Sequence, residues 1–213
     1  MILSIDTATS QASLAIGEPG ERVPDAIIAS KNDLSKRIGT VAASLCRDRG
    51  ITPRELSGII IADGPGSFTG LRIGAAFAKG MHDAAKIPLY TAPSLLGAAL
   101  AAGSAAAAGR VAVVAEYDAL RGDVYRAIYD FPVIGDRSSV TIVVAPELVP
   151  REAPPHVRDY AVADERNASA SALLRLMGMA GGPAPIEHPA TWEPSYGRPA
   201  EAEARRLSRD AAR

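Results

Sequence analysis

The sequence is poor in cysteine, in aromatic side chains and in net charge. Its 213 residues include 1 Cys and 5% aromatic residues, and 23 Lys+Arg stand against 24 Asp+Glu for a formal net charge of -1. One cysteine excludes an internal disulfide and a cysteine-based metal site, and it fits a reducing cytoplasm. The balanced charge argues against a domain that grips a nucleic-acid backbone by itself, so we expect any such contact to need a partner or a small local patch.

Long apolar runs are also missing. The first residues lack the basic and apolar regions of a signal peptide, and no segment reaches the roughly 20 apolar residues that cross a bilayer. The alanine-rich stretch 94–108 is interrupted by Gly103 and Ser104, and alanine contributes little transfer energy in lipid. We therefore expect a cytoplasmic protein without a membrane partner, in which this stretch is a helix end and a linker.

What the chain does contain is a regular alternation of apolar segments and turns, with 47% hydrophobic residues overall. Period-2 patterns and short apolar runs predict strands at 2–6, 12–17, 26–30, 58–63, 88–91, 110–117, 123–131, 138–144 and 160–163. Helical spacing and capping residues predict helices at 33–49, 69–85, 93–102 and 168–179. The low-complexity segment 103–109 divides the chain, so we expect two α/β lobes, residues 1–103 and 104–213, ending in a charged tail that is a solvated helix or frays.

Two of the predicted helices carry apolar stripes that exceed what one core contact needs. The stripe of helix 33–49 consists of Leu34, Ile38, Val41, Ala42 and Leu45. Helix 69–85 has one stripe with Ile73, Ala76, Phe77 and Gly80 and a second with Leu71, Ala75 and Ala78. Small residues allow another helix to come close, so the pattern fits either core packing or a face that binds a partner.

Polar groups gather after two of the predicted strands. Asp6 ends the first strand, and the loop Gly64-Pro65-Gly66-Ser67-Phe68-Thr69-Gly70 precedes the second helix without the Lys-Ser/Thr of a Walker loop. Amides at a helix N-terminus favour an anion, so a nucleotide such as ATP or ADP could bind at Asp6, Thr7, Ser10, Gly64, Gly66 and Ser67. The residues themselves favour a hairpin turn at Asp6 and tight strand-to-helix packing at the loop over a ligand site, and both interpretations stay open.

Groups for catalysis are sparse. The histidines are isolated, and Ser67 lies outside a Gly-x-Ser-x-Gly elbow. We therefore expect no metal site, no catalytic residue and no cofactor of the chain's own. A charged turn between strands accounts for Asp118, Arg121 and Asp123 better than acid-base chemistry does. The histidines are His82, His156 and His188.

Four segments, in this order, carry a family resemblance: ILSIDTATSQASLAI, ADGPGSFTGLRIGAAFAKG, DALRGDVYRAIY and EPSYGR. Together they resemble the bacterial TsaB (YeaZ-type) family over nearly the whole chain, and the Gly-Pro-Gly-Ser-Phe-Thr-Gly-x-Arg-Ile-Gly run is the most specific part. The resemblance implies an α/β protein with an actin-like ATPase (ASKHA, RNase H-like) fold, whose two duplicated lobes each combine a mixed sheet with helices.

The resemblance also implies a role in making N6-threonylcarbamoyladenosine at position 37 of tRNAs that read codons beginning with A. In that family the protein is a non-catalytic paralogue of TsaD, which transfers the threonylcarbamoyl group, and the ATPase TsaE supports turnover. We thus expect a scaffold that pairs with TsaD through the helices at 34–49 and 69–85, forms a homodimer when alone and reaches tRNA only through the complex. The chain departs from the family pattern at Leu34, where many members carry His, and over residues 131–160.

Two enzymes with the same fold remain as alternatives. An actin-like ATPase or kinase would use Asp6 and the loop 64–70, although no second acidic phosphate motif follows in the later half. A glycoprotease would need a metal site or a nucleophile, and the sequence shows neither pattern.

Overall fold

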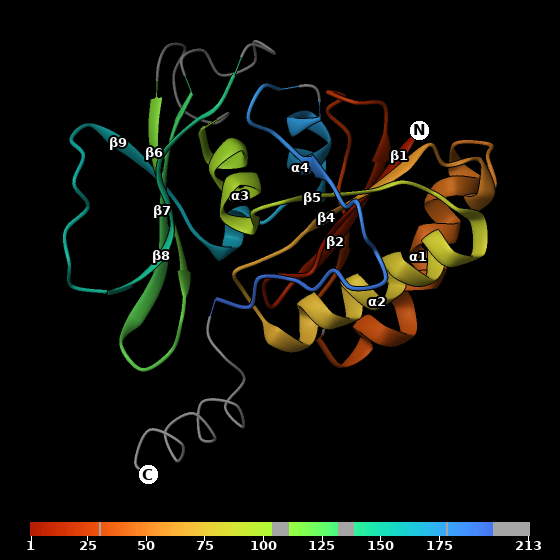
Figure 1. The fold of residues 1–213 in the computed structure, drawn as a ribbon, viewed down its shortest axis with the longest axis horizontal. Helices are drawn as coiled ribbons and strands as arrows, with labels where there is room; N and C mark the ends of the chain where they lie inside the picture. The colour runs from red at the N-terminus through yellow and green to blue at the C-terminus, as the bar shows by residue number, and fades with distance from the viewer. Residues whose placement is uncertain (30, 104–110, 132–138, 178, 198–213) are drawn as a thin grey trace.

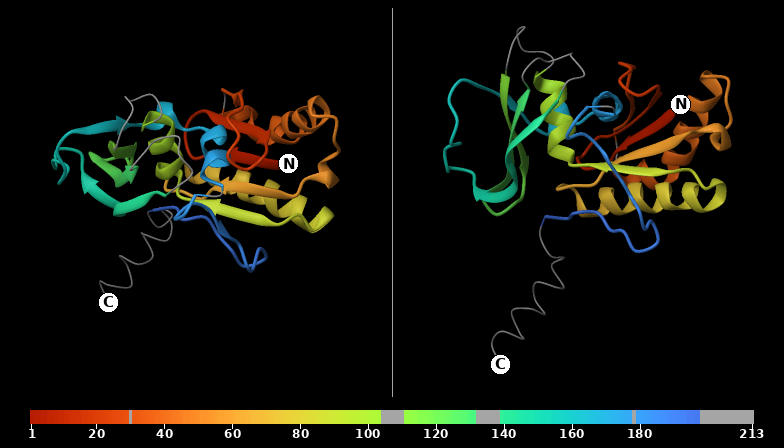
Figure 2. Two further views of the ribbon diagram at one scale, coloured as in Figure 1. Left: turned by 90° about the horizontal axis from the view of Figure 1, so that it is seen from above. Right: turned by 45° about the horizontal axis from the view of Figure 1, so that its top comes forward.

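The computed structural model describes residues 1–29, 31–103, 111–131, 139–177 and 179–197 (Figure 1). Two β-sheets lie along the long axis of the molecule, as two further views confirm (Figure 2). The first sheet has the strand order β10-β5-β4-β1-β2-β3 and the second has the order β8-β7-β6-β9. This arrangement confirms the predicted α/β class with a mixed sheet in each half.

The first sheet has a parallel centre and antiparallel flanks. β1 pairs in parallel with β4, and β4 with β5, whereas β2, β3 and β10 join as antiparallel strands. All five residues of β4 are buried, which confirms that this apolar run is a central strand covered on both faces. The strands are β1 (Ile2–Asp6), β2 (Ala12–Gly17), β3 (Ala26–Ile28), β4 (Gly58–Ala62), β5 (Leu89–Ala92) and β10 (Ala184–Pro185).

Helices cover both faces of the first sheet. α1 (Lys31–Asp48) and α2 (Phe68–Ala85) lie side by side on one face, while α3 (Ser94–Gly103) and α4 (Ala170–Leu176) lie between the two sheets (Figure 1). Because side chains alternate along a strand, Leu3 and Ile5 belong to the core under α1 and α2, and Ile60 belongs to the core around α3. Two short 3-10 helices complete the set: η1 (Pro53–Glu55) and η2 (Glu165–Asn167).

The second sheet consists of β6 (Val111–Asp118), β7 (Asp123–Phe131), β8 (Thr141–Pro150) and β9 (Tyr160–Ala163), and α3 packs on the face that looks toward the first sheet. The strand predicted at 138–144 instead ends at Pro150. Pro146 indicates a strand end in the sequence, but β8 is an edge strand with an irregular register opposite Arg126 and Ile128, where a residue without an N–H is tolerated.

The chain returns to the first sheet at α4 and β10. α4 packs against β1 and β2, where Ser4 Oγ donates to the Ala170 carbonyl (2.6 Å) and the Ala170 amide donates to Ser13 Oγ (2.9 Å). α4 ends at Leu176, earlier than the predicted residue 179. The lobe boundary at residues 103 and 104 stays a prediction, and most of the linker and the tail from residue 198 lie outside the described residues.

Every helix among the described residues is too short or too polar to cross a lipid bilayer.

Candidate partner-binding surface

α1 forms a core-facing helix whose charges suit its ends. Asp33 lies in the first turn and Arg47 in the last, where the helix dipole favours an acid and a base respectively. Its apolar stripe is taken up by the first sheet, because Leu34, Ile38 and Ala42 are at most 4% exposed and pack in the core cluster beneath α1 and α2. That these three side chains contact a partner stays a prediction. The sheet of the same molecule already covers them.

α2 has two apolar sides, as predicted, and they face different surroundings. Its cap forms locally, since Ser67 Oγ accepts a hydrogen bond from the Gly70 amide (3.3 Å). The side facing the core consists of Gly70, Leu71, Gly74, Ala75 and Ala78. On the other side Ala76 and Gly80 are exposed, while Ile73 and Phe77 are half-buried. This second side is the part of the predicted partner-binding set that reaches the surface.

α1 and α2 meet along a seam of small residues. A Cβ at Gly39 would lie 3.8 Å from the Phe77 ring, so the two helices touch there, and Gly39 and Ala43 are exposed one turn apart on α1. Val41 and Leu45, also predicted as partner-binding, are half-buried and pack against the same core as Ile73 and Phe77. We call the set Gly39, Ala43, Ile73, Ala76, Phe77 and Gly80 the helix-pair surface. The spacing of Gly39 and Ala43 beside the apolar stripe is the sequence signal that would have identified α1's contribution.

Residues 192–197, here called the C-terminal strap, run along α2. The rings of Phe68 and Tyr196 stack at 4.6 Å, and the Arg72 guanidinium lies 4.2 Å from the centre of the Phe68 ring. Further along the helix, Lys79 Nζ lies 3.4 Å from Glu193 Oε1 and 5.8 Å from the Trp192 ring. The strap includes most of the EPSYGR segment, but no local pattern in that segment indicates that it binds α2.

The strap also reaches the second sheet. The Ser195 amide donates to the Asp63 carbonyl (2.7 Å), and the Tyr125 hydroxyl of β7 donates to the Tyr196 carbonyl (3.4 Å). A hydrogen bond from the Tyr196 hydroxyl lowers the pKa of Glu193, and Lys79 adds to this effect. The strap therefore connects helix α2 with both sheets.

The turn after β1 and the loop 64–70 touch, as the predicted nucleotide site requires, but their contacts are those of tight packing. The Ser67 amide donates to the Ala8 carbonyl (2.6 Å). A Cβ at Gly66 would collide with that carbonyl, and one at Gly70 would collide with the Thr7 carbonyl. These glycines thus allow two backbones to approach closely.

The polar groups at this contact are mostly enclosed. The Gly64 amide donates to Ser94 Oγ (2.9 Å), and Gly64 is buried. Thr7 is buried and its hydroxyl lacks a partner among the described residues, whereas Ser10 is exposed and Gly66 and Ser67 are half-buried. The amides of Gly64, Ser67 and Gly70 already have protein acceptors, so the contacts favour packing. Binding of ATP or ADP here stays a prediction.

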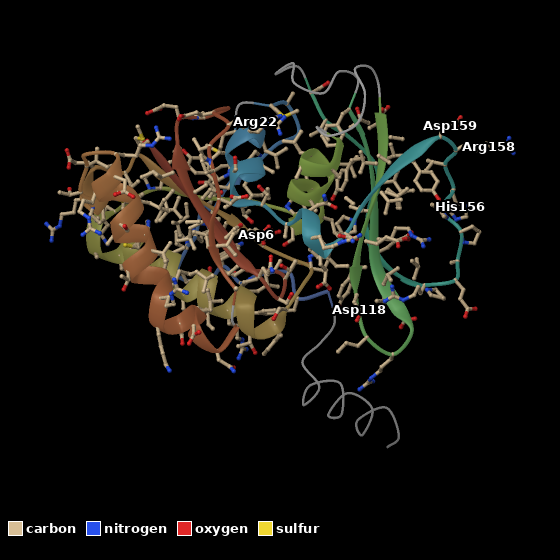
Figure 3. The ribbon with its side chains drawn as sticks, turned by 180° about the vertical axis from the view of Figure 1, so that it is seen from behind. Asp6, Arg22, Asp118, His156, Arg158 and Asp159 are labelled. Carbon is tan, nitrogen blue, oxygen red and sulfur yellow. The ribbon has the colours of Figure 1, made fainter. Side chains whose placement is uncertain are left out.

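Asp6 lies at the end of β1 near the middle of the molecule (Figure 3). It is 0% exposed; Oδ1 accepts from the Ala8 amide (3.0 Å), and Oδ2 has no partner in the described part of the chain. Burial raises the pKa of Asp6 to about 6, although the Ala8 amide acts in the opposite direction, and Asp25 raises it further.

The remaining candidate groups do not converge on a site. Asp118 forms an ion pair with Arg151 (2.7 Å), and Leu120, Arg121 and Gly122 have positive φ, which agrees with a tight charged turn. Within the described residues, no group of three or more His, Cys, Asp or Glu side chains is placed to hold a metal ion.

The amino-acid sequence of the chain matches a known protein family. The family model for TsaD, tRNA N6-adenosine threonylcarbamoyltransferase, matches residues 23–144. The tRNA threonylcarbamoyladenosine biosynthesis protein TsaB of Bacillus subtilis is 34% identical over 130 residues, covering 61% of this chain and 55% of the relative. The Escherichia coli protein of the same name is 31% identical over 150 residues, covering 70% and 64%. The chain thus spans between half and two thirds of the length of these relatives.

Two further similarities extend over more of the chain. An uncharacterized Mycobacterium bovis protein is 29% identical over 197 residues, which cover 87% of this chain and 88% of that one. A crystal structure of a Pseudomonas aeruginosa protein, described as similar to the peptidase YEAZ, superposes with a TM-score of 0.77 at 23% identity and covers 92% of this chain and 99% of that one. The structural match shows a shared fold alone.

Proposed function

The chain belongs to the TsaD family, as a member of its TsaB (YeaZ-type) group, and from this premise we propose that it is a scaffold subunit for the formation of N6-threonylcarbamoyladenosine in tRNA. The observation that supports this role is the helix-pair surface. It combines exposed small residues, Ala76 and Gly80, with the half-buried apolar side chains of Ile73 and Phe77. A second pair of helices can approach such a surface closely and cover those side chains.

In this proposal the chain is not itself the transferase. The relatives at 31–34% identity are named biosynthesis proteins TsaB, whereas relatives named tRNA N6-adenosine threonylcarbamoyltransferase are 27–30% identical over shorter segments. Asp6, the carboxyl at the end of β1, is enclosed and lies against the Ala8 amide rather than at a surface. TsaD would supply the reacting groups, and this chain would hold TsaD in an active form.

The helix-pair surface would serve two alternative partners. TsaD would occupy it in the active complex, and a second copy of this chain would occupy it when TsaD is absent. The two assemblies are mutually exclusive in this scheme because they use the same surface. TsaE would join the complex with TsaD, and tRNA would be bound by the complex rather than by this chain, whose formal net charge is -1.

The test is a reconstitution with TsaD and TsaE of the same organism, tRNA, ATP and threonylcarbamoyl-adenylate, in which modified adenosine is measured by mass spectrometry. We expect modification to depend on this chain and the chain alone to modify nothing. Equal modification in its absence would refute the scaffold role, and so would transferase activity of the isolated chain.

A pair of variants tests the surface. Ala76→Arg places a large charge on the helix-pair surface, and Ala145→Arg makes the same change at an exposed alanine of β8. Sedimentation velocity should show that Ala76→Arg loses both the complex with TsaD and the homodimer, while its circular dichroism and thermal unfolding stay like those of the unmodified chain. Ala145→Arg should keep both assemblies. Retained pairing of a folded Ala76→Arg protein would show that the surface lies elsewhere.

A further inference from the structure

The second sheet has a hollow on the face that points away from α3. Along β6, Val113, Ala115 and Tyr117 join the core with α3, so Val114 and Glu116 face the other way. The segment between β8 and β9 stands off from this face. His156 and Arg158 belong to this segment (Figure 3). The hollow has a volume of about 260 Å³, and its lining is Val114, Glu116, Arg126, Arg151, Glu152, Ala153, Pro154, Pro155, Tyr160 and Val162.

A buried arginine with unused donors lies in this lining. Arg126 is 5% exposed, and its Nε donates to Glu116 Oε1 at 2.6 Å. A guanidinium carries five N–H donors, and the structure gives the two terminal nitrogens of Arg126 no protein acceptor among the residues it describes. These two nitrogens are not among the fully buried atoms without a partner, so they retain contact with solvent, and a planar carboxylate is the acceptor that fits two of their donors at once.

The charges around Arg126 exclude a simple anion as the best ligand. Glu152 lines the same hollow and would repel it, as would the Glu116 oxygen that is not bonded to Arg126, while the Arg151 charge is already paired with Asp118 at 2.7 Å. The two carboxylates would attract an ammonium group. A ligand that carries a carboxylate and an ammonium group together satisfies both signs.

The rest of the lining is apolar. Val162 from the sheet, the Tyr160 ring and two prolines of the segment 151–155 form the exposed walls, whereas Val114 is 1% exposed and offers almost no surface. Pockets for drug-sized ligands have volumes of about 300–1,000 Å³, so this smaller hollow suits a compact molecule. An aliphatic or aromatic group could contact Val162 and the Tyr160 ring while its polar end faces Arg126.

We propose that this hollow binds a small zwitterion with an apolar body, the chemistry of a free apolar α-amino acid. Arg126 would bind the carboxylate, Glu116 and Glu152 would attract the ammonium group, and Val162 would contact the side chain. None of these residues belongs to the helix-pair surface, so the site would act beside the scaffold role and does not depend on it.

The experiment titrates the whole chain with L-leucine and follows backbone amide shifts by NMR. A dissociation constant on the order of 1 mM is expected for a ligand of this size. N-acetyl-leucine lacks the ammonium charge and leucinamide lacks the carboxylate, so each should bind at least roughly tenfold more weakly if one charged contact is lost. The proposal would be refuted if either analogue bound as tightly as leucine. It would also be refuted if neither leucine nor phenylalanine shifted the amide signals at a ligand concentration of roughly ten times the expected dissociation constant.

Matched variants locate the site. Val162 is 60% exposed in the hollow and Val143 is 49% exposed in β8 outside it, so both positions tolerate a polar side chain. Val162→Glu places a carboxylate where the ligand would lie and should weaken leucine binding at least roughly tenfold, whereas Val143→Glu should change it less than about twofold. Equal binding by both variants would show that leucine binds elsewhere. Pairing with TsaD should be unchanged in both, which separates this test from that of the scaffold.

Discussion

At the scale of single residues, Asp6 is a charge that the fold stabilises poorly. One oxygen of its carboxyl accepts the Ala8 amide, while the other has no partner in the described chain, and burial raises the pKa to about 6 from 3.8. The native state therefore binds a proton at this carboxyl more tightly than the unfolded chain does. The contribution of Asp6 to stability is most favourable below about pH 4 and is lost as the pH rises through about 6.

Asp6→Asn should remove the free-energy cost of holding an ionised carboxylate in the buried site. Because the pKa differs by about two units and each unit corresponds to about 1.4 kcal/mol, the variant should gain about 3 kcal/mol relative to the unmodified chain between about pH 4 and pH 7.5. Urea unfolding at several pH values measures this. Asp48→Asn, at an exposed position of α1, is the control. A stability difference between Asp6→Asn and the unmodified chain that stays constant with pH would contradict the prediction.

The sequence predicts the position of Asp6 but not its surroundings. Its place after an apolar strand follows from the local pattern, and the neighbouring hydroxyls and glycines suggest a ligand site. Whether a carboxyl at a strand end faces solvent depends on what the rest of the chain places over it. Here the loop 64–70 and α4, which are distant in sequence, enclose the end of β1.

At the scale of elements, α2 uses its glycines in two opposite ways. Gly70 faces the core, where its missing side chain lets the Thr7 carbonyl approach. Gly80 faces outward, and a Cβ added there would have no other atom within 4 Å. The same substitution at the two positions should therefore change stability in opposite directions.

Gly70→Ala should destabilise the fold by about 3 kcal/mol, because the added carbon displaces a backbone carbonyl that cannot move by rotation of a side chain. Gly80→Ala should stabilise it by about 0.5–1 kcal/mol through the higher helix propensity of alanine. Chemical denaturation of both variants measures the difference. Similar effects at both positions would mean that the contact between α2 and the turn after β1 is looser than described.

Helical periodicity predicts the existence and extent of α1 and α2 but not what each apolar stripe contacts. The stripe with Leu34 and Ile38 suits a partner as well as a core, yet the chain's own first sheet covers it. The helical period identifies an apolar face that must be buried. It does not show whether the chain's own sheet or a partner protein covers that face. Residue size does not separate the two stripes of α2 either, because its core side also contains glycine and alanine.

At the scale of the whole molecule, the C-terminal strap connects parts that are far apart in sequence. Tyr196 stacks on Phe68 of α2, and its carbonyl accepts a hydrogen bond from Tyr125 of the second sheet. The strap thus sets how α2 lies relative to the rest of the molecule. This role is not predictable from local pattern, since the strap has neither strand alternation nor helical period.

Tyr196→Ala should destabilise the protein by about 2 kcal/mol, as it removes the stacked ring and one partner of the Arg72 guanidinium. Amide hydrogen exchange should show faster exchange in residues 192–197 and in the first turns of α2. Tyr196→Phe keeps the ring and loses only the hydroxyl bond to Glu193, so its effect should be small. If Tyr196→Phe destabilises as much as Tyr196→Ala, the ring contacts do not hold the strap.

The packing of α4 on β1 and β2 also bears on how the chain folds as it is made. Ser4 bonds to Ala170 and the Gly20 amide bonds to the Leu174 carbonyl, so one face of the earliest strands is covered by residues that leave the ribosome more than a hundred positions later. Contacts of such long separation slow folding and leave apolar surface open meanwhile. On the ribosome, this face of the first sheet therefore stays uncovered until α4 has been made.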